Sequence, residues 1–370
     1  KDDAFLRDVA YPYLKEVADH YASYVVSRDG AYELPHACAQ ELCNQRTASA
    51  AMIPQHSPTM DLAYAGWLLE KATAWAERLG ETPDPRWLEI AEALAPPAET
   101  SDPCCGEREC NFVGPHNNAT FDMSWADDAC VLYSEAYLEP WNETLDADRV
   151  DGCYSFSNAS VGCAARGNST VSYANTDYPI TIFSLVYPTG RVGLESDSAA
   201  LRKMRTTIWA VNERNRWRPL NGLCLAWPAA ARVTDKHDPY PYAPDAMLDR
   251  WEDVLRNTTF PNFLTDTQKG EGSAGGSLEN LGAAVAIQEL LLQSHEGFLR
   301  FFPGWPLGEA ASFSNFRGRG AFAVFASVDA EGVAADVSVT SEAGAPCVVL
   351  SPWAPMGFRV RDAATGLEVA

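Results

Sequence analysis

No stretch of this chain reaches the roughly 18 consecutive apolar residues that a membrane-spanning helix needs, so we expect no membrane insertion. Basic residues are also scarce, because 28 Lys and Arg stand against 50 Asp and Glu, a net charge of −22. A field of that sign repels phosphate backbones and anionic membrane surfaces, which argues against nucleic-acid and lipid partners. The six histidines lack zinc-ligand spacing and the ten cysteines lack a paired C-x-x-C pattern, so no metal or other cofactor is expected.

Cysteines and glycosylation motifs, by contrast, are frequent. Ten cysteines accompany five Asn-x-Ser/Thr sequons, a combination that predicts a disulfide-bonded protein, secreted or on the extracellular surface, made by the secretory pathway. The chain begins with Lys1 and shows no signal peptide. We therefore expect that it starts inside a longer precursor, whose upstream part is a partner of this one. The expected glycosylation sites are Asn118, Asn142, Asn158, Asn168 and Asn257.

The length of 370 residues exceeds what one hydrophobic core usually supports, so we expect more than one unit. Helical periodicity fills two blocks, and the window between them holds six of the ten cysteines and four of the five sequons. We interpret that window as a disulfide-stapled surface insertion, in which adjacent Cys104 and Cys105 pair with different partners. The expected units are a helical part at 1–99, the insertion at 100–175, a second helical part at 176–306 and a β unit at 307–370.

Helices are predicted where apolar residues recur at three- and four-residue steps. Ser57 as a capping hydroxyl and Pro58 in the first turn predict the start of one helix, which Gly80 closes. Asp61 in its first turn either complements the helix dipole, which we favour, or faces a site. Besides this helix, others are expected over about 3–27, 86–95, 197–211, 221–233 and 244–256. The buried stripe expected on the first comprises Leu6, Val9, Tyr13, Val17, Tyr21 and Tyr24 or Val25.

Two further features concern packing. Trp209, Trp217 and Trp227 could stack on a pyranose ring, but core packing is the commoner fate of tryptophan. After Pro306 apolar residues alternate, which predicts a small antiparallel β unit. Its entry, Arg317-Gly318-Arg319-Gly320, is expected to shape the junction rather than to contact a ligand. The strands are expected at 321–328, 335–341, 347–350 and 358–362.

The stretch 275–306 is the centre of the expected site. A Gly-rich loop offers Glu279 and Asn280 and then continues into a helix with an apolar stripe. Gly297 is the expected C-cap, because glycine enters the left-handed conformation without a Cβ penalty. From the residues alone, an ordinary core helix after a flexible loop is the simpler interpretation.

The end of this stretch resembles glycoside hydrolase family 95, the inverting α-L-fucosidases and relatives such as α-L-galactosidases. In that family a carboxylate-bearing loop runs into a helix ending LLQSH, followed by a G-x-L-R-(L/F)-(L/F)-P-x-(L/W)-P signature. The resemblance implies a mainly α fold, a partial (α/α)6 barrel with the disulfide-rich insertion and a small C-terminal antiparallel β domain. The matching residues are Leu291, Leu292, Gln293, Ser294, His295, Gly297, Leu299, Arg300, Phe301, Phe302, Pro303, Trp305 and Pro306.

The resemblance also implies a general acid. A family loop, L-P-x-x-x-S-P-E, ends in the catalytic glutamate, and the similar loop here ends at Glu41. Ala39 and Gln40 replace the usual Ser-Pro. Cys38 and Cys43 bracket Glu41 and pair either with each other or each with a distant cysteine. From residue type alone, Glu41 would be a solvated surface carboxylate.

Inverting hydrolysis needs a second group, which activates water on the opposite face of the sugar ring. Alignment of LLQSH places the family's aspartate at Leu278, and the neighbouring Glu279 is the expected base or water-orienting group. The two asparagines that hold the water in the family would lie before Lys1. Among the expected contacts, His295 is from residue type alone a capping or packed histidine. The expected substrate contacts are Asn280, His36, His295 and Trp305.

Two functions follow from this comparison. In the first, the chain is part of a secreted glycosidase that removes terminal α-linked fucose or a related sugar from glycans. In the second, it is a glycan-binding or structural extracellular glycoprotein that keeps the fold without turnover. The replacements at Ala39, Gln40 and Leu278 and the disulfide-stapled insertion favour the second. We nevertheless place the first slightly ahead.

Overall fold

The computed structural model describes residues 3–35, 46–47, 55–101, 104–113, 118–126, 131–133, 137–138, 150–151, 155–156, 180–214, 217, 223–261, 265–266, 274–353 and 358–369. Its helices are α1 (Asp3–Phe5), the π-helical turn η1 (Leu6–Ala10), α2 (Tyr11–Tyr24), α3 (Thr59–Leu79), α4 (Pro85–Glu92), α5 (Ile180–Phe183), α6 (Ser198–Arg214), α7 (Leu223–Arg232), α8 (Pro244–Thr258) and α9 (Gly276–Leu291). Short strands connect them: β1 (Val26–Arg28), β2 (Ala31–Glu33), β3 (Arg46–Thr47), β4 (Gln55–His56), β5 (Glu99–Ser101), β6 (Cys110–Val113), β7 (Asn118–Phe121), β8 (Val131–Tyr133), β9 (Tyr137–Leu138), β10 (Val150–Asp151), β11 (Ser155–Phe156), β12 (Thr265–Asp266), β13 (Ala274–Gly275), β14 (Leu292–Gln293) and β15 (Arg300–Phe301). The last three strands, β16 (Ala311–Gly318), β17 (Phe322–Val328) and β18 (Ala334–Ser341), form one sheet.

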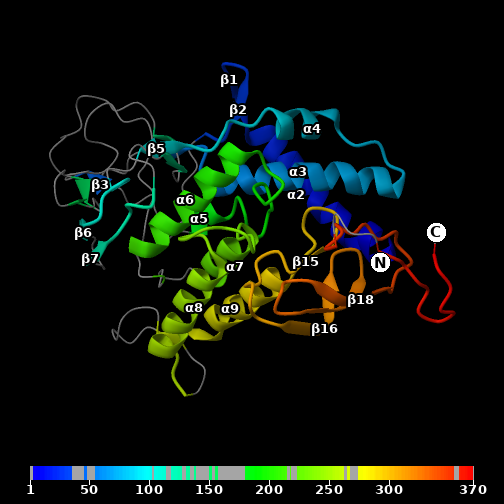
Figure 1. Ribbon diagram of the computed structural model, residues 1–370. Helices are drawn as coiled ribbons and strands as arrows, with labels where there is room; N and C mark the ends of the chain where they lie inside the picture. The colour runs from blue at the N-terminus through cyan, green and yellow to red at the C-terminus, as the bar shows by residue number, and fades with distance from the viewer. Residues whose placement is uncertain are drawn as a thin grey trace.

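Alternate helices of the chain lie against one another. α3 packs on α5, α5 on α7, and α7 most extensively on α9. The intervening helices α6 and α8 pack on α7, while α2 and α4 pack on α3. Arg232 at the end of α7 pairs with Glu289 near the end of α9, so these two helices run in the same direction. The described helices thus contain one layer made of α3, α5, α7 and α9, with the others packed around it (Figure 1).

The first predicted helix is divided by a π-helical turn. Val9 and Tyr13 are predicted to be buried, but they are 55% and 75% exposed. That part of the predicted stripe is wrong. The turn η1 adds a residue per turn and shifts the helical phase, which an uninterrupted 3.6-residue repeat does not anticipate. The buried face also depends on alanine, which lets α2 approach its neighbour closely and which a search for large apolar residues overlooks. The buried residues are Leu6, Tyr11, Leu14, Ala18 and Ala22.

A β-hairpin follows α2, in a part of the chain where the sequence predicts no strand. β1 and β2 pair in antiparallel register, with Arg28 opposite Ala31. Asp29 and Gly30 both have positive φ, 50° and 85°. Two consecutive residues of that kind form the turn that suits the twist of a hairpin, which explains the Asp-Gly pair.

The helix predicted after Ser57 is confirmed as α3. Its buried face is built on Leu62, Leu69 and small residues, as the three- and four-residue spacing predicts. Gly80 adopts φ 76° at the C-terminus of α3, a conformation that causes no steric clash in glycine because glycine has no Cβ. The prediction that Ser57 caps the helix is wrong, because Pro58 stands at the N-cap and Ser57 Oγ instead accepts a hydrogen bond from Leu34 N at 3.1 Å.

The second helical part also follows the sequence pattern. α6, α7 and α8 coincide closely with the predicted helices, and α4 with the one predicted at 86–95. Trp209, Trp217 and Trp227 are 2%, 1% and 2% exposed and pack in one core. Their rings contact one another, with centroids 5.2 Å apart for Trp209 and Trp217 and 4.8 Å for Trp217 and Trp227. Core packing, the favoured interpretation of these residues, is therefore confirmed.

The C-terminal β unit is a three-stranded antiparallel sheet with β17 in the centre. The strands predicted at 321–328 and 335–341 are confirmed as β17 and β18. Those predicted at 347–350 and 358–362 are wrong, since these segments form isolated bridges, Leu299 to Val349 and Arg361 to Glu368. The sequence pattern misses β16, because a bulge between Phe313 and Phe316 interrupts the alternation of buried side chains.

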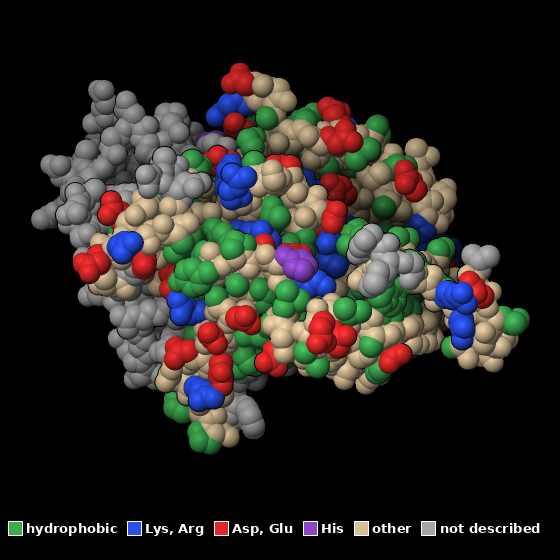
Figure 2. All heavy atoms as spheres, viewed as in Figure 1, with side chains coloured by type: hydrophobic (Ala, Val, Ile, Leu, Met, Phe, Trp, Pro, Cys, Tyr) green, Lys and Arg blue, Asp and Glu red, His purple; other side chains and the backbone are tan. Residues whose placement is uncertain are grey.

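The acidic side chains are distributed rather than gathered. Figure 2 shows Asp and Glu scattered over the visible face, with Lys and Arg among them. Many form ion pairs, such as Lys203 with Glu99 and Arg191 with Glu70. Among the helices that the structure describes, none is long and apolar enough to cross a membrane.

Candidate functional site

The expected general acid, Glu41, and the expected substrate contact His36 lie outside the described residues. The chain on either side of them is described and is held together. Ser57 N donates to Leu34 O at 2.7 Å, and Leu34 N donates to Ser57 Oγ at 3.1 Å. Ser57 reaches this geometry with φ 47°. These two bonds tie the chain before Glu41 to the chain that opens α3.

Asp61 lies in the first turn of α3, directly after this junction. Pro58 stands at the N-cap, so the role favoured for Asp61 from the sequence is that of a charge near the helix N-terminus. That charge is disfavoured, because burial raises the pKa of the Asp61 carboxyl from 3.8 to about 6. Tyr21 of α2 lies close by, and its own pKa is raised first by burial and then by the Asp61 charge. Asp61 is therefore a half-buried carboxyl that readily holds a proton.

We expect Asp61→Asn to raise the free energy of unfolding at pH 8 and to have little effect at pH 4. The pKa in the folded chain, about 6, exceeds the ordinary 3.8, so the protonated form stabilises the fold and that stabilisation is lost as the pH rises through about 6. The amide removes the penalty, about 1–3 kcal/mol at neutral pH after allowance for partial solvent exposure. Urea unfolding at several pH values measures it.

Asp245, an exposed acid in the first turn of α8, provides the matched control. Asp245→Asn should change the free energy of unfolding by less than about 0.5 kcal/mol throughout the range. An Asp61→Asn effect that is equal at pH 4 and pH 8 would contradict a burial-driven pKa.

Glu279 and Asn280 lie in the first turns of α9, which begins at Gly276, and not in a loop as the sequence predicts. Nothing is described of their side chains. Gly297 is not a helix C-cap either, since α9 ends at Leu291 and the chain continues into β14. Gly297, with φ 92°, lies in the loop between β14 and β15.

The structure separates the expected site residues along α9. From Glu279 to Leu291 the helix rises by about 18 Å, at about 1.5 Å per residue, and His295 lies beyond that far end. Trp305 is also at the far end, where it packs against both the helical core and the core of the β unit. Its Nε1 donates to Glu309 O at 3.0 Å. His295 and Trp305 are thus brought together with the junction to the β unit, and not with Glu279 and Asn280.

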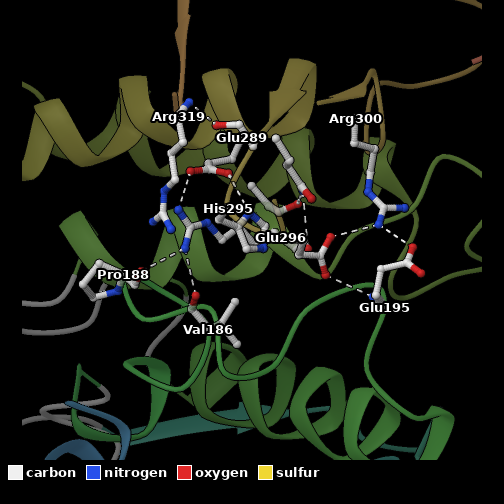
Figure 3. A network of polar contacts seen from close by, with 12 residues as sticks. Val186, Pro188, Glu195, Glu289, His295, Glu296, Arg300 and Arg319 are labelled. Carbon is white, nitrogen blue, oxygen red and sulfur yellow. Dashed lines mark hydrogen bonds and ion pairs between the residues drawn. The ribbon is translucent and has the colours of Figure 1, made fainter. Parts of the chain in front are cut away.

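A buried polar network joins the ends of α7 and α9 (Figure 3). Arg232 Nη2 donates to Glu289 Oε1 at 2.8 Å, and the two side chains are 5% and 11% exposed. Arg232 Nη1 donates to Val186 O at 2.9 Å and to Pro188 O at 3.3 Å. The guanidinium also lies 4.5 Å from the Tyr187 ring centroid. This cation therefore fixes the turn after α5 to both helices.

His295 adjoins the network without being bonded to it. Its Nδ1 lies 3.9 Å from Glu289 Oε2, too far for a hydrogen bond, and its side chain is 1% exposed. Burial lowers the pKa of His295 to about 3, with further lowering by Arg232, Arg319 and Arg300. The ring is neutral at physiological pH. The expected role in sugar binding stays a prediction, but a cap is ruled out by its position beyond the helix.

A second ionic group lies beside it in Figure 3. Arg300 Nη2 donates to Glu195 Oε1 at 2.5 Å and to Glu296 Oε2 at 2.9 Å. Glu195 N in turn donates to Glu296 Oε1 at 3.1 Å. Arg300 thus ties the segment before α6 to the hairpin of β14 and β15.

Sequence reasoning misses the pair of Arg232 and Glu289. Glu289 is the one carboxylate in the mainly apolar run 283–292, and Arg232 ends the apolar helix α7. A charge inside an apolar helix needs a partner when it is buried, so each of these positions carries a signal. The partner itself lies 57 residues away and is set by how α7 meets α9.

Some of the predicted disulfide-bonded cysteines and two of the five sequon asparagines are among the described residues. Cys104 and Cys110 form a disulfide, and Cys105 is also disulfide-bonded, so the adjacent pair has different partners as predicted. Asn257 is exposed in the last turn of α8, and Asn118 begins β7. The pairing of Cys38 and Cys43 and the sequons at Asn142, Asn158 and Asn168 lie outside the described residues.

No protein-family model matches the chain, and no curated protein matches it. Within the part of the chain that the structure describes, no group of three or more His, Cys, Asp or Glu could hold a metal ion.

Proposed function

We propose that this chain is part of a secreted inverting glycoside hydrolase that removes terminal α-linked fucose or a related sugar from glycans. Glu41 is the general acid, Glu279 is the base or water-orienting group, and Asn280 and His36 contact the sugar. The fold of this proposal is a partial (α/α)6 barrel. The proposal rests on the resemblance of the two catalytic segments and on the arrangement of the helices.

The observation that carries the proposal is the layer of alternate helices. α3, α5, α7 and α9 are successive neighbours in space although other helices separate them in the sequence, as in a barrel of helical hairpins. Glu41 precedes α3, and Glu279 lies in the first turn of α9. In Figure 1 both helices begin towards the left of the view and end towards the right. This supports placing the two carboxyls at the same end of the layer, where a sugar could lie between them.

The extracellular setting has separate support. The disulfides of Cys104 and Cys105 belong to an oxidising compartment, and Asn257 offers an exposed sequon. We propose Asn-linked glycans at Asn257 and at the four other sequons. Removal of glycans by an amidase, followed by mass measurement of the peptides, identifies the occupied asparagines.

The function is tested by incubating the secreted full-length protein with aryl and oligosaccharide α-fucosides and α-galactosides. We expect release of the free sugar, first as the anomer opposite to that of the substrate, because water attacks directly in an inverting mechanism. Proton NMR spectra taken in the first minutes distinguish the two anomers. Retention of configuration would overturn the roles given to Glu41 and Glu279.

The second candidate is a glycan-binding or structural glycoprotein without turnover. The replacements at Ala39, Gln40 and Leu278 favour it, since they alter both catalytic segments of the resemblance. Saturable sugar binding with no product after long incubation would support this candidate. If the protein neither hydrolyses nor binds these sugars, both candidate functions are overturned.

A further inference from the structure

The turn between β16 and β17 carries Arg319, whose guanidinium has no ion-pair partner among the described residues. Arg319 N donates to Ser294 Oγ at 3.0 Å, which fixes the backbone of the turn beside the loop after α9. Its guanidinium has no hydrogen bond or ion pair among the described residues. Arg317, two residues earlier, is instead paired with Glu342. Arg317 in β16 and Arg319 in the turn after it thus differ in whether their charge is paired among the described residues.

The uncompensated charge lies in a positive environment. Burial lowers the pKa of Arg319, and Arg232 lowers it further, while Glu289 and Tyr187 act in the opposite direction. Glu289 is already hydrogen-bonded to Arg232, so its charge is shared between the two arginines. Figure 3 shows the Arg319 side chain extending towards Pro188, which lies in the turn after α5. Arg319 is an exposed residue. An accessible guanidinium without a partner among the described residues is a strong donor for an anion.

His295 supplies a second unused donor. The side chain is 1% exposed, and neither ring nitrogen has a hydrogen-bond partner in the described structure. Buried polar groups are almost always bonded, so an orphan imidazole needs an explanation. The ring packs directly against the backbone of the neighbouring loop, since a Cβ on Gly190 would lie 3.1 Å from Cδ2 and one on Gly193 would lie 3.3 Å from Nε2.

We propose that Arg319 and His295 form part of a binding site for an oxyanion, a carboxylate or sulfate group, at the junction of α9 with the β unit. Arg319 supplies the charge and a forked pair of donors, and neutral His295 supplies one N–H. Arg232 stays bonded to Glu289 and adds a positive field from behind. The site is independent of the proposed hydrolysis, because Glu279 lies at the other end of α9.

The experiment follows the His295 ring by NMR in the full-length protein labelled with ¹³C-histidine. Sulfate and glucuronate are added separately at constant ionic strength, with glucose and chloride as blanks. We expect a saturable shift of the His295 resonances with one or both oxyanions and none with the blanks. A tighter response to glucuronate would assign the group to a sugar acid, and a tighter response to sulfate would assign it to an inorganic or sugar-linked sulfate.

Two matched variants decide the role of the arginine. Arg319→Gln should weaken oxyanion binding by about tenfold or more, the usual effect of losing a hydrogen bond to a charged group. Arg317→Gln should change it by less than about twofold, because an exposed charge that is already paired adds little. Arg319→Lys should recover part of the binding, since it keeps the charge without the fork.

Several results would overturn the proposal. One is the absence of a saturable shift with either oxyanion, and another is an equal loss in Arg317→Gln and Arg319→Gln, which would indicate general screening. Binding that leaves the His295 resonances unmoved would also overturn it. Thermal unfolding of each variant confirms that the comparison is made between folded proteins. Turnover of fucosides enters none of these readouts, so failure here is separate from failure of the proposed hydrolysis.

Discussion

Replacement of Glu41 by glutamine is expected to lower kcat on an oligosaccharide α-fucoside by about 10²–10⁴-fold, because the amide cannot protonate the leaving oxygen. The loss should be much smaller on a dinitrophenyl fucoside, whose leaving group departs without protonation. Steady-state kinetics on the two substrates therefore separates an acid from a residue that merely supports the fold. KM should change little on either substrate, since the substituted side chain is similar in size.

Two controls sharpen this result. Glu279→Gln should reduce turnover of both substrates alike, because activation of water is needed whatever the leaving group. Glu331→Gln, an exposed glutamate at the turn before β18, should leave both rates unchanged. Equal losses on the two substrates in Glu41→Gln would assign Glu41 a role other than acid, and unchanged rates would remove it from the site.

What the sequence predicts well here is periodic and local. α3 is predicted from apolar spacing and from Gly80, because both signals act within a few turns of one helix. The same rules fail for the first helix, where the π-helical turn Leu6–Ala10 shifts the buried face. They fail again at Gly297, which has the positive φ of a C-cap but serves a hairpin loop. A glycine in the sequence indicates that a positive φ is possible there, but it does not indicate whether a helix end or a hairpin loop adopts it.

The candidate site is predicted less completely, because its parts meet only in three dimensions. A charged residue in an apolar helix can be noticed in the sequence, as with Glu289, but its contact with Arg232 depends on how two helices pack. The same holds for Asp61, whose raised pKa comes from burial and from no neighbour in the sequence. Resemblance supplies Glu41 and Glu279 as residues, whereas their distance from each other remains a prediction.

The largest expected effect on stability comes from Arg232→Met, which removes one partner of a buried ion pair. Loss of the guanidinium leaves the Glu289 carboxylate buried without its cation and leaves Val186 O and Pro188 O without a donor. Changes of this kind typically reduce the free energy of unfolding by about 3–5 kcal/mol. Urea or thermal unfolding measures the loss, and near-UV circular dichroism reports whether the aromatic core around Trp227 stays packed.

The surface pair of Arg256 and Glu252 provides the comparison, with both side chains exposed on α8. Arg256→Met should reduce stability by no more than about 1 kcal/mol, since solvent replaces the lost partner. The double variant Arg232→Met with Glu289→Met should recover much of the loss, because two apolar side chains leave no buried charge behind. Additive losses in the double variant would mean that Arg232 stabilises the fold through the carbonyls of Val186 and Pro188 rather than through Glu289.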